Sequence, residues 1–141
     1  FLEIKGMDVN VYGGNKAGWK NYKGLLPYGV KDEGMFQYKY VFNAENYEIK
    51  NYYTEKLIDG ILAECLVFYC GCPNIFDFFD ERALVKLELV NFEKDFQTIS
   101  RAIHENWYMT RLPYIREAKK KILNETQFFP RLERILSNVT S

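Results

Sequence analysis

The amino-acid sequence predicts an α/β fold: a Rossmann-like parallel sheet flanked by helices, with a helical C-terminal section. Three observations lead to this prediction. Residues 38–56 read as a strand, a polar loop and a helix. The continuous apolar run Leu66–Cys70 follows, as expected for a strand buried on both faces of a parallel sheet. From Phe92 onward the apolar period becomes helical.

The N-terminal third predicts one strand between less regular segments. Residues 1–5 read as the last turn of a helix that Gly6 closes. Residues 8–12 alternate valines with polar side chains before a pair of glycines, which favours a strand ending in a tight turn. Residues 15–34 are rich in glycine and polar side chains, so we expect mostly loop there.

The central strand-loop-helix unit places a polar loop where ligands bind in folds of this class. Residues 38–43 are aromatic and β-branched enough for a strand, and residues 45–53 have loop composition. Thr54 is a good N-cap for the amphipathic helix that follows. The loop therefore lies at the carboxyl end of its strand, the edge at which open α/β sheets bind ligands.

The remaining elements are a short strand and several helices. Residues 73–82 predict a loop, and residues 84–89 a further strand. A helix beginning at Phe92 would present Phe92, Phe96, Ile99 and Ile103 on one face. Residues 107–123 continue in helix, with Pro113 either kinking it or starting a new one, and residues 128–136 predict a last short helix.

Length and charge limit the classes of protein. A chain of 141 residues predicts a single domain spanning residues 1–141. The 19 basic side chains balance the 19 acidic ones, so we expect no nucleic-acid partner, and no apolar run is long enough for a membrane segment. Because the chain starts at Phe1 rather than Met, we expect it to be a fragment of a longer protein.

The three cysteines do not predict a metal centre or a disulfide framework. Cys70 and Cys72 are too close for a CxxC pair, and Cys65 leaves an odd number. We expect free, buried thiols, which slightly favour a reducing, cytoplasm-like compartment. The compartment of the parent protein is otherwise unknown.

Lys56 stands at an unusual place for a cation. It lies in the first turn of the predicted helix, where a positive charge opposes the helix dipole by about 0.3–1 kcal/mol. A bound anion such as phosphate would remove that conflict. The alternative is a solvated lysine that pairs with Asp59 or Asp32.

Several fixed residues of this stretch stand at characteristic spacing. They are Tyr38-Lys39-Tyr40, Glu45-Asn46, Tyr52 six positions after Asn46, and Thr54-Glu55-Lys56. This pattern resembles the donor-binding signature of the α1,3/4-fucosyltransferases, glycosyltransferase family 10. The resemblance extends from about Asp8 to about Phe92, and departs at Tyr47, where the family usually has a small serine.

The resemblance implies the donor lobe of a two-lobed GT-B glycosyltransferase. The donor would be the nucleotide sugar GDP-fucose, with no cofactor and no metal required. The glycan acceptor would be reached through a missing N-terminal lobe, which would also hold the catalytic base. We therefore expect no catalytic residue in this chain and no sugar transfer by it alone.

For the phosphate and sugar end of the donor, the resemblance implies two contacts, and the glycine pair at Gly13 and Gly14 predicts a third. Lys56 would bind the phosphates, and Glu55 would contact the sugar or the ribose, although a carboxylate in the first helical turn also suits the dipole. Gly13 fits a turn near the phosphates because a residue without a side chain lets the backbone approach a ligand. A plain hairpin or βα turn at Gly13 is the alternative.

For the nucleoside end, the predicted contacts lie in the loop. Asn46 would touch the nucleotide, or would merely close an Asx-turn. Tyr52 offers a flat face and a hydroxyl suited to ribose or guanine, with neighbouring Tyr53 expected to pack in the core instead. Glu45 would order the loop or bond a ribose hydroxyl.

Two other functions fit the same sequence. One is a non-catalytic binding module that keeps the fold without the chemistry. The other is a glycosyltransferase that uses a different nucleotide sugar, such as a UDP or ADP sugar, and Tyr47 is the residue that favours it.

Overall fold

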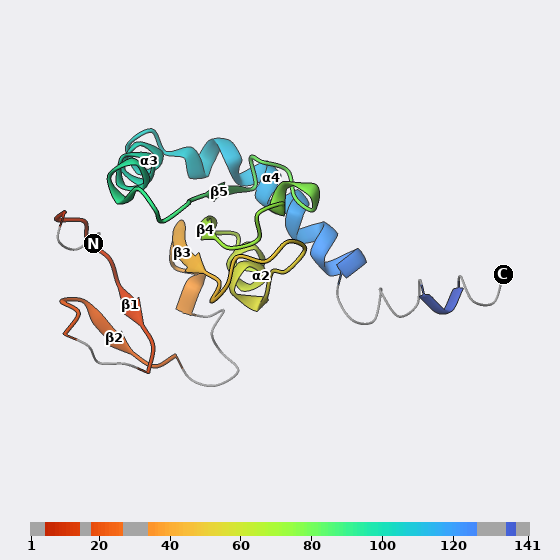
Figure 1. Ribbon diagram of the computed structural model, residues 1–141, viewed down its shortest axis with the longest axis horizontal. Coiled ribbons are helices and arrows are strands. Elements are labelled where there is room, and N and C mark those ends of the chain that lie inside the picture. The colour runs from red at the N-terminus through yellow and green to blue at the C-terminus, as the bar shows by residue number, and fades with distance from the viewer. Residues whose placement is uncertain (1–4, 15–17, 27–33, 127–134, 138–141) are drawn as a thin grey trace.

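A three-stranded parallel sheet organises the protein (Figure 1). The computed structural model describes residues 5–14, 18–26, 34–126 and 135–137. The strands are β3 (Tyr40–Ala44), β4 (Leu66–Cys70) and β5 (Leu84–Lys86), in the spatial order β3-β4-β5. Tyr40 is in register with Leu66, and Val67 with Leu84. The α/β class and the parallel sheet predicted from the sequence are confirmed.

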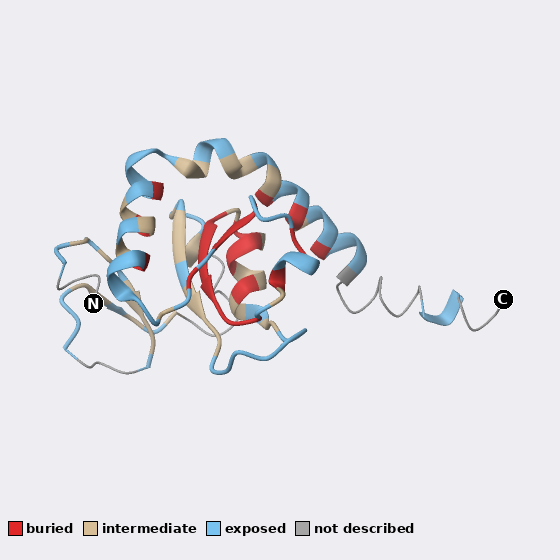
Figure 2. Ribbon diagram, turned by 45° about the horizontal axis from the view of Figure 1, so that its top comes forward, coloured by how far each residue is buried: buried red, intermediate tan, exposed pale blue. Residues whose placement is uncertain are grey.

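Strand β4 is the centre of the core, and every one of its residues is buried (Figure 2). Its side chains alternate between two apolar clusters. Val67 and Tyr69 join the cluster that contains helix α2 (Glu55–Leu62). Leu66 and Phe68 join the cluster on the opposite face, which contains residues of two later helices. The prediction of a strand buried on both faces is confirmed, because an apolar cluster covers each face of β4.

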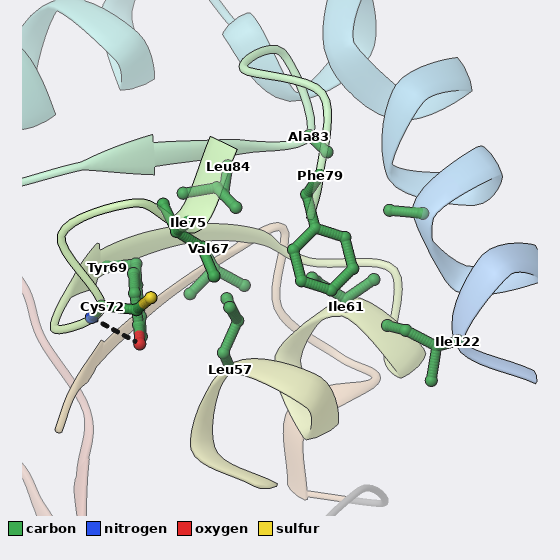
Figure 3. Close-up of a cluster of buried hydrophobic side chains, with 11 residues drawn as sticks. Leu57, Ile61, Val67, Tyr69, Cys72, Ile75, Phe79, Ala83, Leu84 and Ile122 are labelled. Atoms are coloured by element: carbon green, nitrogen blue, oxygen red, sulfur yellow. Dashed lines mark hydrogen bonds between the residues drawn. The ribbon is translucent and has the colours of Figure 1, made fainter. Parts of the chain in front are cut away.

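Helix α2 packs closely on the sheet because it carries a glycine at the contact. A Cβ atom at Gly60 would lie 2.7 Å from Cγ2 of Val67 and 3.1 Å from Cγ2 of Val41. The buried residues Leu57 and Ile61 lie on the same side of the helix and fill the space beside it (Figure 3). The amphipathic helix predicted after Thr54 is confirmed.

The N-terminal segment forms a second, smaller sheet. Strand β1 (Val11–Tyr12) pairs in parallel with β2 (Tyr22–Gly24), and both lie beside the main sheet in Figure 1. The strand predicted over residues 8–12 is thus present but short. The prediction of mostly loop over residues 15–34 missed β2, whose sequence Tyr-Lys-Gly has no apolar alternation to reveal it.

Helix α3 (Phe92–His104) turns a different face to the core from the one predicted. Ile99 is buried as expected, but Phe92 is 51% exposed and Ile103 is 42% exposed. The buried face instead includes Asp95, whose carboxylate accepts a hydrogen bond from the Leu89 backbone N–H at 2.9 Å. This bond orients the first turn of the helix.

Strand β5 is shorter than the predicted residues 84–89, since it ends at Lys86. Three residues later, Leu89 adopts a left-handed backbone conformation with φ of 56°. The same residue donates the hydrogen bond to Asp95. The loop predicted over residues 73–82 contains one short 3₁₀ helix, η1 (Ile75–Asp77).

Helix α4 (Trp107–Lys121) runs through Pro113 without a break and continues into the π-helical segment η2 (Ile122–Thr126). Of the two alternatives predicted at Pro113, a kink or a new helix starting at Tyr114, the second is wrong. Arg116 and Lys119 of α4 form ion pairs at 2.9 and 3.0 Å with Glu64, just after α2. Hydrogen bonds from Arg116 and Lys119 lower the pKa of Glu64.

Two predictions lie outside the described residues. They are the helical turn over residues 1–5, apart from Lys5, and the last helix over residues 128–136, apart from a helical turn at 135–137. Within the part of the chain that the structure describes, no helix is both long and apolar enough to cross a membrane.

The close packing at Gly60 yields a stability prediction. In an exposed helix, replacing glycine by alanine stabilises by about 1 kcal/mol. At this position the added methyl group overlaps Val67, so we expect Gly60→Ala to lower the free energy of unfolding by about 1–2 kcal/mol. Urea unfolding measures the change, with Gln97→Ala on the exposed side of α3 as control. A raised midpoint for Gly60→Ala would show that α2 does not pack as described.

Candidate functional site

The candidate site lies where β3 ends and a nine-residue loop, 45–53, leads to the start of α2. The Glu45 backbone N–H donates to the Cys70 carbonyl oxygen at 2.9 Å, which extends the ladder between β3 and β4 by one bond. The side chain of Glu45 therefore begins the loop from a fixed point at the carboxyl edge of the sheet.

The Glu45 carboxylate is completely buried and closes the loop on itself. Oε1 accepts a hydrogen bond from the Thr54 backbone N–H at 2.9 Å, and Oε2 accepts one from the Thr54 hydroxyl at 2.8 Å. Of the two roles predicted for Glu45, these bonds correspond to ordering of the loop. Because the side chain is completely buried, a ribose hydroxyl would have to displace one of the groups that cover the carboxylate.

Thr54 is the N-cap of α2, as predicted. Its hydroxyl oxygen accepts a hydrogen bond from the Lys56 backbone N–H at 3.3 Å. The same hydroxyl donates to Glu45, so one side chain joins the helix start to the end of the strand. The first turn of α2 is thereby held in a single place relative to the sheet.

Lys56 already has a negative partner within the chain. Its Nζ lies 3.6 Å from Oε2 of Glu45 and donates a hydrogen bond to Oδ1 of Asn46 at 3.4 Å. Glu45 thus supplies a negative charge that reduces the conflict with the helix dipole, for which a bound phosphate and a pairing with Asp59 or Asp32 were the predicted alternatives. The side chain of Lys56 remains 36% exposed, so an anion in solution can still reach it.

Tyr69 supports the Glu45 carboxylate from the buried face of β4. Its hydroxyl accepts from the Cys72 backbone N–H at 3.1 Å and donates to Oε1 of Glu45 at 3.4 Å. Burial raises the pKa of Tyr69 far above its usual range, so the hydroxyl stays protonated and remains a donor.

Asn43 and Asn74 also hold the site, and neither was predicted. The Asn43 side-chain amide donates to the Lys56 carbonyl oxygen at 2.6 Å, from β3 to the first turn of α2. The Asn74 carboxamide exchanges hydrogen bonds with the backbone and side chain of Asn51, at 2.9 and 2.7 Å. The positive φ of Asn51, 63°, shows that the loop turns sharply there.

The remaining predicted contacts of the loop and helix start lie at the surface. Asn46 and Glu55 are exposed, and the ring of Tyr52 is 45% exposed. Tyr53 instead packs edge-on against Phe78 and Phe79 in the core. The prediction that one of the two tyrosines packs inside is confirmed, and Tyr52 is the one left at the surface.

Gly13 does not share this cluster. It lies in the small sheet, where its N–H donates to the Gly24 carbonyl oxygen at 3.0 Å. It lines a cavity of about 570 Å³ between the N-terminal segment and β3, which Asn43 also lines. Among the described residues, no hydrogen bond joins Gly13 to residues 54–56.

The predicted free thiols are confirmed. Cys65, Cys70 and Cys72 are all buried and none forms a disulfide. Burial raises the pKa of the Cys65 thiol, and that of the Cys70 thiol, to about 11. The Cys65 and Cys70 thiols are therefore poor nucleophiles at neutral pH.

The arrangement can bind an anion that carries a flat ring. An accessible ammonium group and the N-terminus of α2 meet at one sheet edge, with an exposed amide and an exposed aromatic ring on the adjoining loop. Such groups suit a phosphorylated nucleoside. The fold is an α/β fold with a parallel sheet, and the site offers groups that suit a nucleotide.

Comparison with known proteins is consistent with this class. No protein-family model matches the chain. An α-(1,3)-fucosyltransferase of Helicobacter pylori is 29% identical over 100 residues, which are 68% of this chain and 21% of that protein. The chain thus spans about a fifth of the length of this curated relative.

Solved structures of α1,3-fucosyltransferases share the fold. One with GDP has a TM-score of 0.57 and 27% identity, over 66% of this chain and 28% of the other. One with GDP-fucose has a TM-score of 0.54 over 77% of this chain and 39% of the other, at 24% identity, and supports the fold alone. The chain is homologous to α1,3-fucosyltransferases, which are glycosyltransferases.

The N-cap yields a prediction that needs no ligand. Thr54→Val keeps the shape of the side chain but removes both hydroxyl hydrogen bonds, so we expect a loss of about 1–2 kcal/mol in the free energy of unfolding. Thr54→Ser keeps the hydroxyl and should lose much less. Equal melting temperatures for Thr54→Val and the unchanged protein would contradict the described helix start.

Proposed function

We propose that this chain is the donor-binding domain of an inverting fucosyltransferase-like glycosyltransferase, corresponding to the donor lobe of a GT-B enzyme. Its ligand is GDP-fucose, and the sugar is transferred to a glycan hydroxyl. The observation that carries the proposal is the pattern from Glu45 to Lys56, which gathers at one sheet edge in a chain homologous to fucosyltransferases.

The chemistry assigned to this chain is stabilisation of the leaving group. A carboxylate base from another part of the enzyme takes the proton of the acceptor hydroxyl. The hydroxyl oxygen then bonds to the anomeric carbon of fucose as the bond from that carbon to the diphosphate breaks. Lys56 and the positive end of the α2 dipole stabilise the departing GDP, so no metal is required.

The remaining contacts are divided along the donor. Asn46 and Tyr52, which are exposed on the loop, bind the nucleoside. Glu55, at the start of α2, binds the sugar or ribose hydroxyls. Gly13 could approach the phosphates only from the small sheet, so its contribution requires that sheet to lie against the bound donor.

Tyr47 favours one alternative, a different nucleotide sugar. Its side chain is 70% exposed on the same loop, close in sequence to Asn46, where it can alter the pocket for the base. Titration of the chain with GDP, UDP and ADP by NMR distinguishes the alternatives. Preference for GDP supports the proposal, preference for UDP or ADP indicates another donor, and binding of none leaves a non-catalytic module.

Removal of the Lys56 charge tests the phosphate contact. Lys56→Ala should weaken GDP binding by about 1.5–3 kcal/mol, the contribution of a charge-assisted hydrogen bond. The fold should persist, because the Glu45 carboxylate keeps both of its bonds from Thr54. Lys50→Ala removes an exposed lysine of the same loop and is the matched control. Unchanged GDP affinity in Lys56→Ala would refute the assignment.

The chain alone should bind the donor without transferring the sugar. It covers only 21–39% of the fucosyltransferases to which it is similar, and we assign the base to a part outside it. Because the chain supplies only a fraction of the contacts that a whole enzyme would make with GDP, its Kd for GDP should be about millimolar. This Kd corresponds to a binding free energy of roughly −4 kcal/mol. The assay supplies GDP-fucose and N-acetyllactosamine-type acceptors to the purified 141-residue chain. Turnover would show that the base lies within it.

A further inference from the structure

Tyr69 is a completely buried tyrosine whose hydroxyl has two polar partners at the candidate site. Figure 3 shows it at one end of the apolar cluster that includes Leu57 and Ile61 of α2, with its hydroxyl joined to the Cys72 backbone N–H. The second partner is Oε1 of Glu45. A phenylalanine would fill the same apolar space, so packing alone does not account for the hydroxyl group.

Gly71 has no side chain, and this leaves room for the Glu45 side chain beside the backbone. A Cβ atom at Gly71 would lie 2.5 Å from Cγ of Glu45 and 2.5 Å from the Tyr69 hydroxyl. The glutamate side chain therefore lies directly against the backbone at the end of β4. It cannot move toward Gly71 without displacing the strand end.

The held carboxylate keeps the Lys56 ammonium at the start of α2. An exposed lysine normally samples many rotamers, and binding then costs about 0.5–1.5 kcal/mol for each side chain that is immobilised. Here Nζ is drawn to Oε2 of Glu45 and to Asn46, which limits the positions that it samples before any ligand arrives.

We propose that Glu45 and Tyr69 are positioning residues that hold the Lys56 ammonium ready for the diphosphate of the donor. Neither touches the ligand, and Tyr69 acts through Glu45. The inference rests on the proposed function only for the identity of the anion. It follows that removing either group weakens diphosphate binding only while Lys56 is present.

A double-mutant cycle with inorganic pyrophosphate tests this dependence. Tyr69→Phe and Glu45→Gln are made in the unchanged chain and in Lys56→Ala, and each Kd is measured by NMR titration, which also reports folding. We expect Tyr69→Phe and Glu45→Gln each to weaken binding about fivefold in the unchanged chain, and by less than about twofold in Lys56→Ala.

Tyr40→Phe is the matched control. The Tyr40 hydroxyl also has two polar partners, which are the Ala102 carbonyl oxygen and the Tyr108 N–H, but it lies in the cluster on the opposite face of the sheet. Its removal should cost stability and leave pyrophosphate affinity unchanged. If Tyr40→Phe weakened binding as much as Tyr69→Phe does, general destabilisation would explain both.

The remaining outcomes separate this inference from the proposed function. Equal weakening with and without Lys56, or none at all, would overturn the positioning role. If pyrophosphate shows the expected cycle but GDP binds no better than UDP, the positioning role stands and the GDP assignment fails. If the unchanged chain binds neither pyrophosphate nor GDP, both fail.

Discussion

The buried carboxylate of Glu45 is the contact on which the candidate site depends. A buried charge without partners costs several kcal/mol, and here the partners come from the start of α2 and from β4. The loop between β3 and α2 must therefore close in the way that satisfies this one group. The need to provide partners for the Glu45 carboxylate therefore both closes the loop and places Lys56.

Much of the main sheet could be predicted because its signals are local. The run Leu66–Cys70 is apolar without interruption, and Thr54 caps the helix with its own side chain. Elements with weak local signals were missed or misplaced. Strand β2 has three residues and little apolar character, and the orientation of α3 follows from a hydrogen bond between Asp95 and Leu89, which no helical period reveals.

At the site, the sequence indicated which residues matter, but it did not predict the ion pair between Lys56 and Glu45. Lys56 lies 11 positions beyond Glu45, and only the closed loop brings them to 3.6 Å. Dipole arguments consider the helix alone, so they left the missing negative charge to a ligand or to Asp59 or Asp32. The role of Tyr69 was not predicted for a different reason. A tyrosine within an apolar strand is expected to be a core residue, and the partners of its hydroxyl, Glu45 and Cys72, lie just beyond the ends of β3 and β4.

The main sheet has an open side at β3, which among the described residues pairs only with β4. The Leu66 N–H donates a hydrogen bond to the Lys39 carbonyl oxygen, and the Glu45 N–H donates one to the Cys70 carbonyl oxygen. The backbone polar groups of the odd-numbered residues from Lys39 to Glu45 therefore point toward β4. The polar backbone groups of Tyr40, Phe42 and Ala44 consequently point the other way, beside an exposed Phe42 ring. Such an edge is a template for strand addition, so the solubility of the chain at high concentration depends on what shields β3.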